Sequence, residues 1–201
     1  MRSLSLAALL TLLASPAAAT VMVEVPLDDM ARRADAIVVG RVVASEVRVV
    51  LDPVRGAEPH TLTELRVTEW IAGAGGAAVV IDELGGELAG QGLAIAGTPV
   101  YRPGEEVVVF LERADGRLRT FAMAQGRFEI RRGVGGVPDY VTRDLSDVAF
   151  VRWGAGGMTV DHGHDVPVAL EVFIEHVRRL AAPRVTLPAS PGGAGGREVS
   201  R

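Results

Sequence analysis

The hydrophobic residues of this chain fall into short runs separated by glycine, proline and charged residues. The densest β-branched run covers residues 34–43, Ala-Asp-Ala-Ile-Val-Val-Gly-Arg-Val-Val. A run of this kind is typical of a strand that is buried on both faces. We therefore expect a strand that begins near Ala36 and extends toward Val50, with the other strands assembled around it.

Later segments alternate between polar and apolar residues, as half-buried strands do. Within residues 61–70, for example, Thr63, Leu65 and Val67 share one face. Asp115-Gly116 between two apolar segments predicts a type I′ hairpin turn. Further strands are expected at residues 78–81, 93–97, 106–111, 118–123, 127–131 and 140–142, and loops at residues 51–60 and 144–165. Short strands at roughly ten-residue spacing predict a sandwich or a small barrel rather than βαβ units.

Two segments have the periodicity of amphipathic helices. Residues 26–34 begin with proline, with acidic residues in the first turn and arginines in the last. The apolar face of this helix comprises Leu27, Met30, Ala31 and Ala34. The second helix is expected from Pro167 to about Ala181, and its apolar stripe comprises Leu170, Phe173, Ile174, Val177 and Leu180. The first helix is expected to lie across an open end of the barrel.

These patterns predict a mainly β fold, a small closed antiparallel barrel with a short N-terminal helix and a C-terminal amphipathic helix. Residues 1–19 resemble a signal peptide, because an apolar stretch too short to span a bilayer precedes the cleavage pattern Ala17-Ala18-Ala19. We expect a barrel domain at residues 20–148, a connecting loop and helix at 149–181, and a disordered tail at 182–201. The mature chain is expected in the periplasm or outside the cell, without a membrane anchor.

The composition excludes several kinds of chemistry. The formal net charge is −4, which argues against nucleic acid as a partner because phosphate binding needs a clustered positive surface. All 21 basic side chains are arginine, and the chain contains no cysteine. A thiolate nucleophile, a Schiff-base lysine, a disulfide and a cysteine-ligated zinc are therefore excluded.

One segment, Asp161-His162-Gly163-His164-Asp165, has the composition of a metal site. Its imidazoles and carboxylates can ligate zinc or another transition metal, and His176 is the best remote ligand. The alternative, which we favour, is a polar loop in which Asp165 caps the following helix. If a metal binds, its ligands are Asp161, His162 and His164, and no cofactor is otherwise predicted.

The remaining candidates are contact residues. Arg127 and Arg131 share a face of one predicted strand, which is either an anionic-ligand patch or a solvated sheet face. Trp70 and Trp153 are interpreted as plugs at the barrel ends, with sugar stacking as the alternative. The serines after residue 20 stand outside a nucleophile-elbow context, and adjacent carboxylates on a strand point to opposite faces. We predict no catalytic residue and expect that the protein is not an enzyme.

Three segments carry a resemblance to a known family. Residues 33–42 lead through an Ala-Asp-hydrophobic run into a strand, residues 65–73 end a strand in a bulky residue and a glycine, and residues 104–110 place a valine-rich strand after a Gly-acid turn. Over about residues 21–131 this order resembles the netrin-like domain, the OB-type barrel of the tissue inhibitors of metalloproteinases. It is also similar to uncharacterised secreted bacterial proteins, some of which accompany matrixin-type metalloproteases.

The resemblance implies an OB-type barrel but does not transfer the inhibitory residues. The inhibitors of that family chelate the protease zinc through an N-terminal cysteine, whereas this mature chain would begin at Thr20. The sequence therefore predicts a secreted or periplasmic, non-enzymatic binding or interaction module whose partner is another secreted or envelope protein. Its candidate contact residues are Thr20, Trp70, Trp153, Arg127 and Arg131. The alternatives are an inhibitor or companion of a secreted metalloprotease and a metal-binding protein that uses residues 161–165.

Overall fold

The computed structural model describes residues 20–88, 90–154, 157–162 and 165–181 of the chain. The predicted signal peptide and tail, residues 1–19 and 182–201, lie outside the described residues. The elements in chain order are β1 (Thr20–Val23), α1 (Leu27–Arg33), β2 (Ala36–Asp52), β3 (Gly56–Ala72), β4 (Ala78–Leu84), β5 (Gly86–Leu88), β6 (Gln91–Leu93), β7 (Glu106–Ala114), β8 (Arg117–Thr120), the 3₁₀-helix η2 (Met123–Gly126), β9 (Arg127–Arg131), β10 (Tyr140–Thr142), β11 (Val148–Gly154), β12 (Gly157–His162), β13 (Val168–Ala169) and α2 (Leu170–Leu180). Within this part of the chain, no helix combines the length and the apolar character that a membrane span needs.

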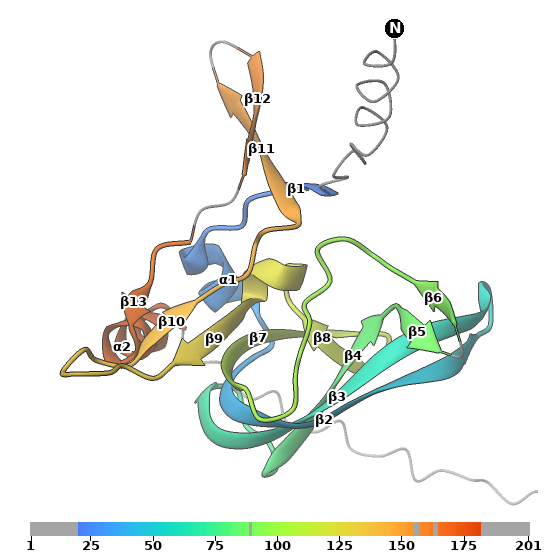
Figure 1. Ribbon diagram of the computed structural model, residues 1–201, viewed down its shortest axis with the longest axis horizontal. Helices are drawn as coiled ribbons and strands as arrows, with labels where there is room; N and C mark the ends of the chain where they lie inside the picture. Colours follow the sequence, from blue (N-terminus) through green and yellow to red (C-terminus); the bar gives the residue numbers. More distant parts are fainter. Residues whose placement is uncertain (1–19, 89, 155–156, 163–164, 182–201) are drawn as a thin grey trace, which may run out of the picture.

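The fold is mainly β, as predicted, and five strands form a ring of hydrogen-bonded neighbours (Figure 1). The order is β7, β2, β3, β4, β8 and back to β7. Most neighbours are antiparallel, but β4 and β8 run parallel and pair at Ile81 and Leu118. One buried cluster lies against the ring and comprises Ala36, Val38, Val42, Leu65, Val79, Ile81, Tyr101, Val107, Val109 and Leu111. The prediction of purely antiparallel pairing is therefore wrong at this junction.

The strand β7 and the first residues of β2, Ala36 to Gly40, are buried on both faces, which explains their nearly continuous apolar sequences. Val38 and Val109 belong to the ring cluster, whereas Ile37 and Phe110 point to the opposite side. There they meet Phe128 of β9 and the two helices in a second cluster. The ring of Phe110 lies 5.6 Å from that of Phe128, centroid to centroid. The prediction of a central, doubly buried strand after residue 34 is confirmed.

The two helices cover this second cluster. Three residues of the predicted apolar face are fully buried, Met30 and Ala31 in α1 and Ala34 at its C-terminal cap, whereas Leu27 is half-buried. The helix α2 begins at Leu170, three residues later than predicted from Pro167, because Val168 and Ala169 pair with β10 as strand β13. Its buried residues are Phe173 and Val177, and the ring of Phe173 lies 4.6 Å from that of Phe128.

The predicted loop over residues 51–60 is wrong, because β2 and β3 form one long hairpin with its turn after Asp52. Pro59 pairs with Val49 inside this hairpin. The carbonyl of Pro59 accepts a hydrogen bond from Gly85 N, so the polar side of its backbone faces β4. The missing N–H of the proline therefore costs the β2–β3 ladder no hydrogen bond. The predicted Asp115-Gly116 turn is confirmed, with φ of 51° and 78°.

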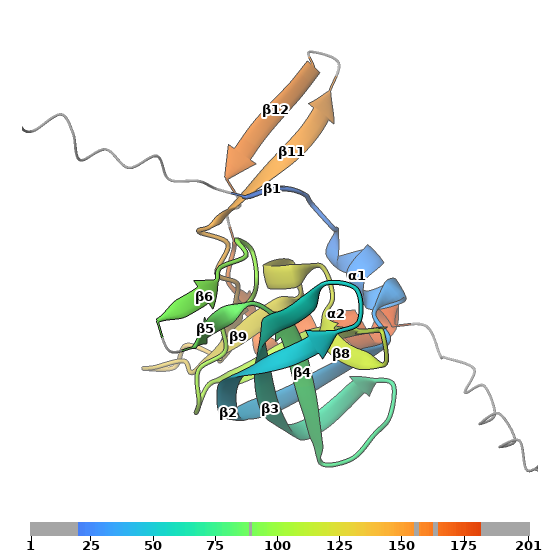
Figure 2. The ribbon, with the colours of Figure 1, turned by 90° about the vertical axis from the view of Figure 1, so that its right-hand side faces the viewer.

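The predicted loop over residues 144–165 is also wrong, because it contains the hairpin of β11 and β12. With β1, which runs parallel to β11, these strands form a separate three-stranded sheet. We call this the projecting sheet, because its hairpin stands away from the rest of the molecule in two perpendicular views (Figures 1 and 2). Among its described side chains, the buried ones lie at the base, where Val148 and Phe150 pack with Ala124 and Leu145.

Candidate functional site

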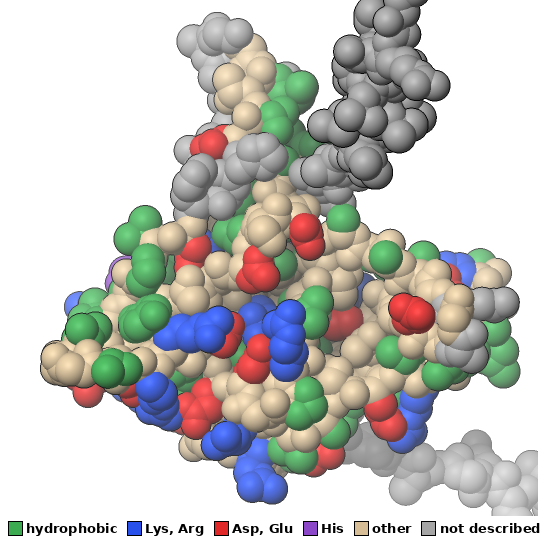
Figure 3. Space-filling view, in the orientation of Figure 1, with side chains coloured by type: hydrophobic (Ala, Val, Ile, Leu, Met, Phe, Trp, Pro, Cys, Tyr) green, Lys and Arg blue, Asp and Glu red, His purple; other side chains and the backbone are tan. Residues whose placement is uncertain are grey.

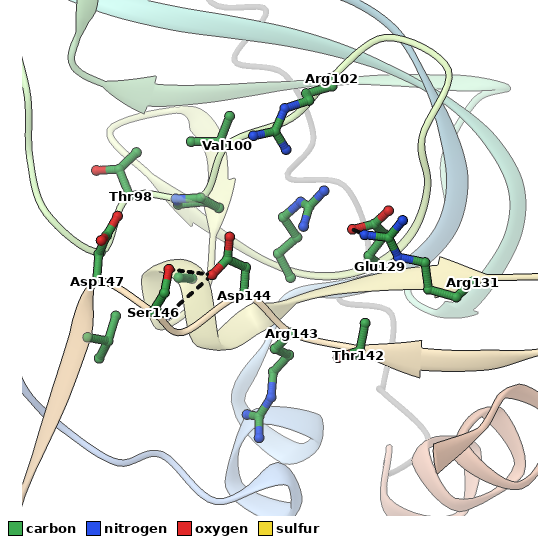
Figure 4. A pocket seen from close by; sticks show the side chains of 15 residues that line it. Thr98, Val100, Arg102, Glu129, Arg131, Thr142, Arg143, Asp144, Ser146 and Asp147 are labelled. Carbon is green, nitrogen blue, oxygen red and sulfur yellow. Dashed lines mark hydrogen bonds and ion pairs between the residues drawn. The ribbon is translucent and has the colours of Figure 1, made fainter. Parts of the chain in front are cut away.

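A cavity of about 320 Å³ lies between the ring and the base of the projecting sheet (Figure 4). Three chain segments meet there: the irregular segment 97–102, the segment 124–131 that contains β9, and the segment 142–148 that leads into β11. Its charged lining residues are Arg102, Arg127, Glu129, Arg131, Arg143, Asp144 and Asp147. In a space-filling view, basic and acidic side chains lie together on the body below the projecting hairpin (Figure 3).

The backbone before β9 turns sharply and places Arg127 at the cavity. Ala122 and Met123 both have positive φ, of 58° and 57°. A Cβ at Gly126 would lie 2.0 Å from the carbonyl oxygen of Phe121, so only glycine fits there. This tight path from β8 through η2 allows Arg127 to start β9 as a buried residue.

Two arginines on one wall of the cavity share a single carboxylate. Arg127 Nη2 lies 2.5 Å from Glu105 Oε2, and Arg102 Nη1 lies 3.4 Å from Glu105 Oε1. The backbone N of Arg102 also donates to Glu105 at 2.9 Å. Although burial alone would raise the pKa of Glu105, this backbone hydrogen bond and the charge of Arg127 hold it below its usual value. Two positive charges therefore meet one negative charge at this wall.

The guanidinium of Arg127 is the most enclosed charge of the site. Only 5 % of the residue is exposed, and its guanidinium lies 5.4 Å from the centre of the Tyr101 ring. Its Nε is buried and has no hydrogen-bond partner among the described residues. Buried donors of this kind are rare in proteins because an unmade hydrogen bond is costly. Arg102, in contrast, has 68 % of its side chain exposed and lies at the cavity rim.

Asp144 lies on the other side of the cavity, with Ser146 and Asp147 (Figure 4). Its Oδ1 accepts hydrogen bonds from the hydroxyl of Ser146 at 2.7 Å and from the backbone N of Ser146 at 3.2 Å. These hydrogen bonds lower the pKa of Asp144, and the charges of Arg127 and Arg102 lower it further. Among the described residues, Asp144 forms no ion pair with either arginine, so opposite charges face each other across the cavity.

The other two arginines of the lining are already paired. Arg131 lies 2.9 Å from Glu129. Arg143 Nε donates to Asp165 at 2.8 Å, and the Arg143 guanidinium stacks on the ring of Phe128. Its side chain points away from Arg102 and Asp144 (Figure 4). Asp165 also accepts from the backbone N of Arg143, which corrects the prediction that it caps α2.

The predicted contact residues do not meet at one site. Arg127 and Arg131 both line the cavity, but Arg127 is buried, so the alternative of a solvated sheet face is wrong at that position. Trp70 packs against the ring cluster, and its Nε1 donates to the carbonyl of Gly76 at 3.2 Å. Thr20 pairs with Val148 at the base of the projecting sheet. Trp153 lies on β11 opposite Met158, and its side chain is outside the described residues.

The predicted metal ligands are only partly covered by the structure. Asp161 is exposed on β12 opposite Phe150, and His162 pairs through its backbone with Ala149. His164 and the side chain of His162 lie outside the described residues. His176 lies on α2 with its Nε2 3.8 Å from Asp28. Among the described residues, no three His, Cys, Asp or Glu side chains are grouped as a metal site.

A buried His–Asp pair was not predicted from the sequence. His60 Nδ1 lies 2.5 Å from Asp82 Oδ1, and Arg117 lies 3.3 Å from the other oxygen of Asp82. An Asp–His pair is also found in hydrolytic triads, where the imidazole contacts a hydroxyl nucleophile. No such hydroxyl is hydrogen-bonded to His60 in the described part of the chain, and the contacts of Asp82 with His60 and Arg117 join β3, β4 and β8.

Arg102 and Asp144 were also missed as site residues. Each has a weak local signal, because Arg102 precedes the Pro-Gly turn and Asp144 stands two residues before a serine, a pattern typical of Asx turns. Neither signal indicates that the two segments meet in space.

A second cavity of about 360 Å³ is mostly apolar and lies between α2, β10 and the segment before α1. Its apolar lining includes Val141, Val168 and Phe173.

Comparison with protein-family models, with curated proteins and with solved structures gives no match. Any assignment of function therefore depends on the geometry of the cavities and on the charges around them.

Proposed function

We propose that this protein is a non-enzymatic binding module of a bacterial envelope or exterior, and that it holds a small charged ligand in the arginine-lined cavity. The observation that carries this proposal is the arrangement of charges. Arg102 and Arg127 share Glu105 on one wall, while Asp144, among the described residues, forms no ion pair with either arginine but lies close enough for their charges to lower its pKa. The cavity volume of about 320 Å³ lies within the range of small-molecule sites.

The enclosed guanidinium supports a binding role. Removing a charged group from water is unfavourable unless it is paired and its hydrogen bonds are made. Arg127 has one carboxylate partner, yet that carboxylate also binds Arg102. A ligand with a hydrogen-bonding anionic group would complete the pairing of this wall.

The properties of the carboxylates favour binding over catalysis. A general acid needs a pKa close to the working pH, whereas the lowered pKa of Asp144 keeps it charged. Burial raises the pKa of Glu83, but Glu83 bonds the backbone N of Thr120 and does not line the cavity. The carboxyl with the raised pKa, Glu83, and the ionised carboxylate, Asp144, therefore lie at different sites. This arrangement is unsuited to catalysis by a paired general acid and base.

Two further proposals concern the frame and the compartment. The five-stranded ring, whose strands pack against a common cluster, supports a small closed barrel of the OB or netrin-like type. The leader-like residues 1–19 support export to the periplasm or the exterior.

The binding function is tested by thermal unfolding of the full mature chain with a panel of small anions, cations, zwitterions and neutral polyols. A ligand present at about a hundred times its dissociation constant adds about 2.7 kcal/mol of stability. For a chain of this length, that corresponds to a melting temperature higher by about 5 to 10 °C. At least one class should produce a saturable shift.

The matched variants decide whether the shift comes from the cavity. The double variant Arg102→Gln/Asp144→Asn should lose the shift, whereas Arg41→Gln/Asp161→Asn should keep it. Arg41 pairs with Glu106 outside the cavity lining, and Asp161 lies on β12. A shift that persists in the first double variant, or a panel without any shift, would contradict the proposal.

A further inference from the structure

The cavity has two walls of opposite charge that belong to different chain segments. Arg102 and Arg127, with their shared Glu105, form the positive wall. Asp144 and Asp147 form the negative wall, on the segment before β11 (Figure 4). The remaining charges of the lining do not change this division, because Arg131 pairs with Glu129 and Arg143 pairs with Asp165.

This division disfavours ligands that carry one sign of charge. A phosphate or a dicarboxylate near Arg127 would be repelled by Asp144, which the lowered pKa keeps ionised. A simple cation near Asp144 would meet the two guanidinium groups. A neutral ligand would displace water from both walls without pairing either charge, which is unfavourable for enclosed groups.

From this geometry we infer that the ligand is a small zwitterion, with its carboxylate bound by Arg102 and Arg127 and its ammonium group bound by Asp144 and Asp147. The inference deepens the proposed function and rests on it. Amino acids and other short amino-carboxylates belong to this class, and their size suits the cavity of about 320 Å³.

The two walls are held in place by different contacts. Glu105 and the ring of Tyr101 orient the guanidinium of Arg127, and Tyr101 is itself fixed by a 2.6 Å hydrogen bond to Thr120. Asp144 is oriented by Ser146. The charges of Arg127 and Asp144 therefore lose little freedom on binding, so these two residues are preorganised for a ligand with a defined separation of charges.

Isothermal titration calorimetry on the full mature chain tests this inference with glycine, β-alanine and 4-aminobutanoate, whose charge separation increases in that order. Acetate and methylammonium serve as the two halves of glycine. We expect one of the zwitterions to bind at least about tenfold more tightly than either half, because a second charge-assisted contact is added.

Two single variants separate the walls. Asp144→Asn should weaken the affinity for the best zwitterion about tenfold and leave the affinity for acetate within about twofold. Arg102→Gln should weaken the affinity for the zwitterion and the affinity for acetate by similar factors. Asp161→Asn and Arg41→Gln, which alter similar charges outside the cavity, should change neither affinity.

The outcomes below distinguish failure of the zwitterion inference from failure of the proposed function. Acetate, methylammonium or inorganic phosphate bound as tightly as every zwitterion, with loss of binding in Arg102→Gln/Asp144→Asn, would overturn the zwitterion and leave the binding module intact. Zwitterion binding that Asp144→Asn does not weaken would also overturn the inference. If none of these probes binds and the thermal panel gives no shift, both this inference and the proposed function fail.

Discussion

The ring and the projecting sheet both contain valine side chains, but the two regions differ in how far these side chains are buried. In the ring, Val38, Val107 and Val109 are fully buried. In the projecting sheet, Val23 is 72 % exposed and Val160 is 54 % exposed. Val80 on the ring strand β4 is 52 % exposed as well, so the presence of a valine in a strand does not by itself determine its burial.

The difference in burial follows from the number of neighbouring strands in each region. Every ring strand has a neighbour on both sides, and its inward side chains meet those of the other strands. The sheet of β1, β11 and β12 has two edges, and the buried residues among its described side chains lie at the base. Closure brings side chains together, whereas a projecting sheet leaves one face in water.

The cavity lies where these two regions meet. Its positive wall is fixed to the ring, since Arg127 contacts Tyr101 of the ring cluster. Its negative wall stands on the segment that leads to Val148 at the base of β11. Because the two walls of the cavity belong to different regions of the molecule, no single segment of the sequence contains the whole site.

The largest expected effect is on the ring. Leu65→Ala removes a fully buried side chain from the ring cluster. We expect a loss of about 2 to 5 kcal/mol in the free energy of unfolding, from lost burial and the cavity that remains. Urea denaturation measures the change, and a loss below about 1 kcal/mol would mean that the ring is not the main source of stability.

A smaller effect is expected at the polar contact inside the ring. Tyr101→Phe removes the hydroxyl that bonds Thr120 at 2.6 Å in a buried environment. The expected cost is about 0.5 to 1.5 kcal/mol, the usual net value of one hydrogen bond. The same denaturation experiment tests it, with Tyr140→Phe on the half-buried strand β10, between β9 and β13, as the control.

A pH-dependent effect is expected at Glu83. Burial raises the pKa of this carboxyl above its usual value of 4.5 in the folded protein. The folded state therefore holds a proton that the unfolded state releases, and this contribution to stability falls as the pH rises from about 4.5 toward the folded pKa. Glu83→Gln removes the titration, so its stability relative to the wild type should increase over this interval. Denaturation at several pH values would show a constant difference if Glu83 were not buried as described.

The smallest effect is expected on the projecting sheet. Met158→Ala shortens a side chain that is 57 % exposed on β12. The free energy of unfolding should change by less than about 0.5 kcal/mol, in contrast to Leu65→Ala. A loss comparable to that of Leu65→Ala would show that this face is packed in solution, and the contrast between the two regions would not hold.

Local signals were sufficient for elements whose neighbours are close in sequence. The apolar face of α1 and the Asp115-Gly116 turn were predicted from a few residues each. The loop predicted at residues 51–60 failed because Pro59 was taken as a strand breaker, although its backbone faces away from β2. The loop predicted at residues 144–165 failed because Gly154 and Gly157 pair with each other in the β11–β12 hairpin.

The candidate site was only half predictable, for a physical reason. Arg127 was found from its strand pattern, but its burial depends on Tyr101 and Glu105, which lie more than one element away. Arg102 and Asp144 stand in irregular segments without periodicity. Their meeting depends on how the ring and the projecting sheet are joined, and a single sequence contains no direct signal for that.

The most direct test of the cavity as the binding site is a titration of the ¹⁵N-labelled mature chain with the tightest zwitterion of the series, followed by amide chemical shifts. The account predicts saturable shifts in residues 97–102, 124–131 and 142–148, with the turn after Asp52 and the strand β12 unchanged. Shifts confined to the apolar cavity beside α2 or to the projecting sheet, or no shifts at saturating ligand, would contradict it.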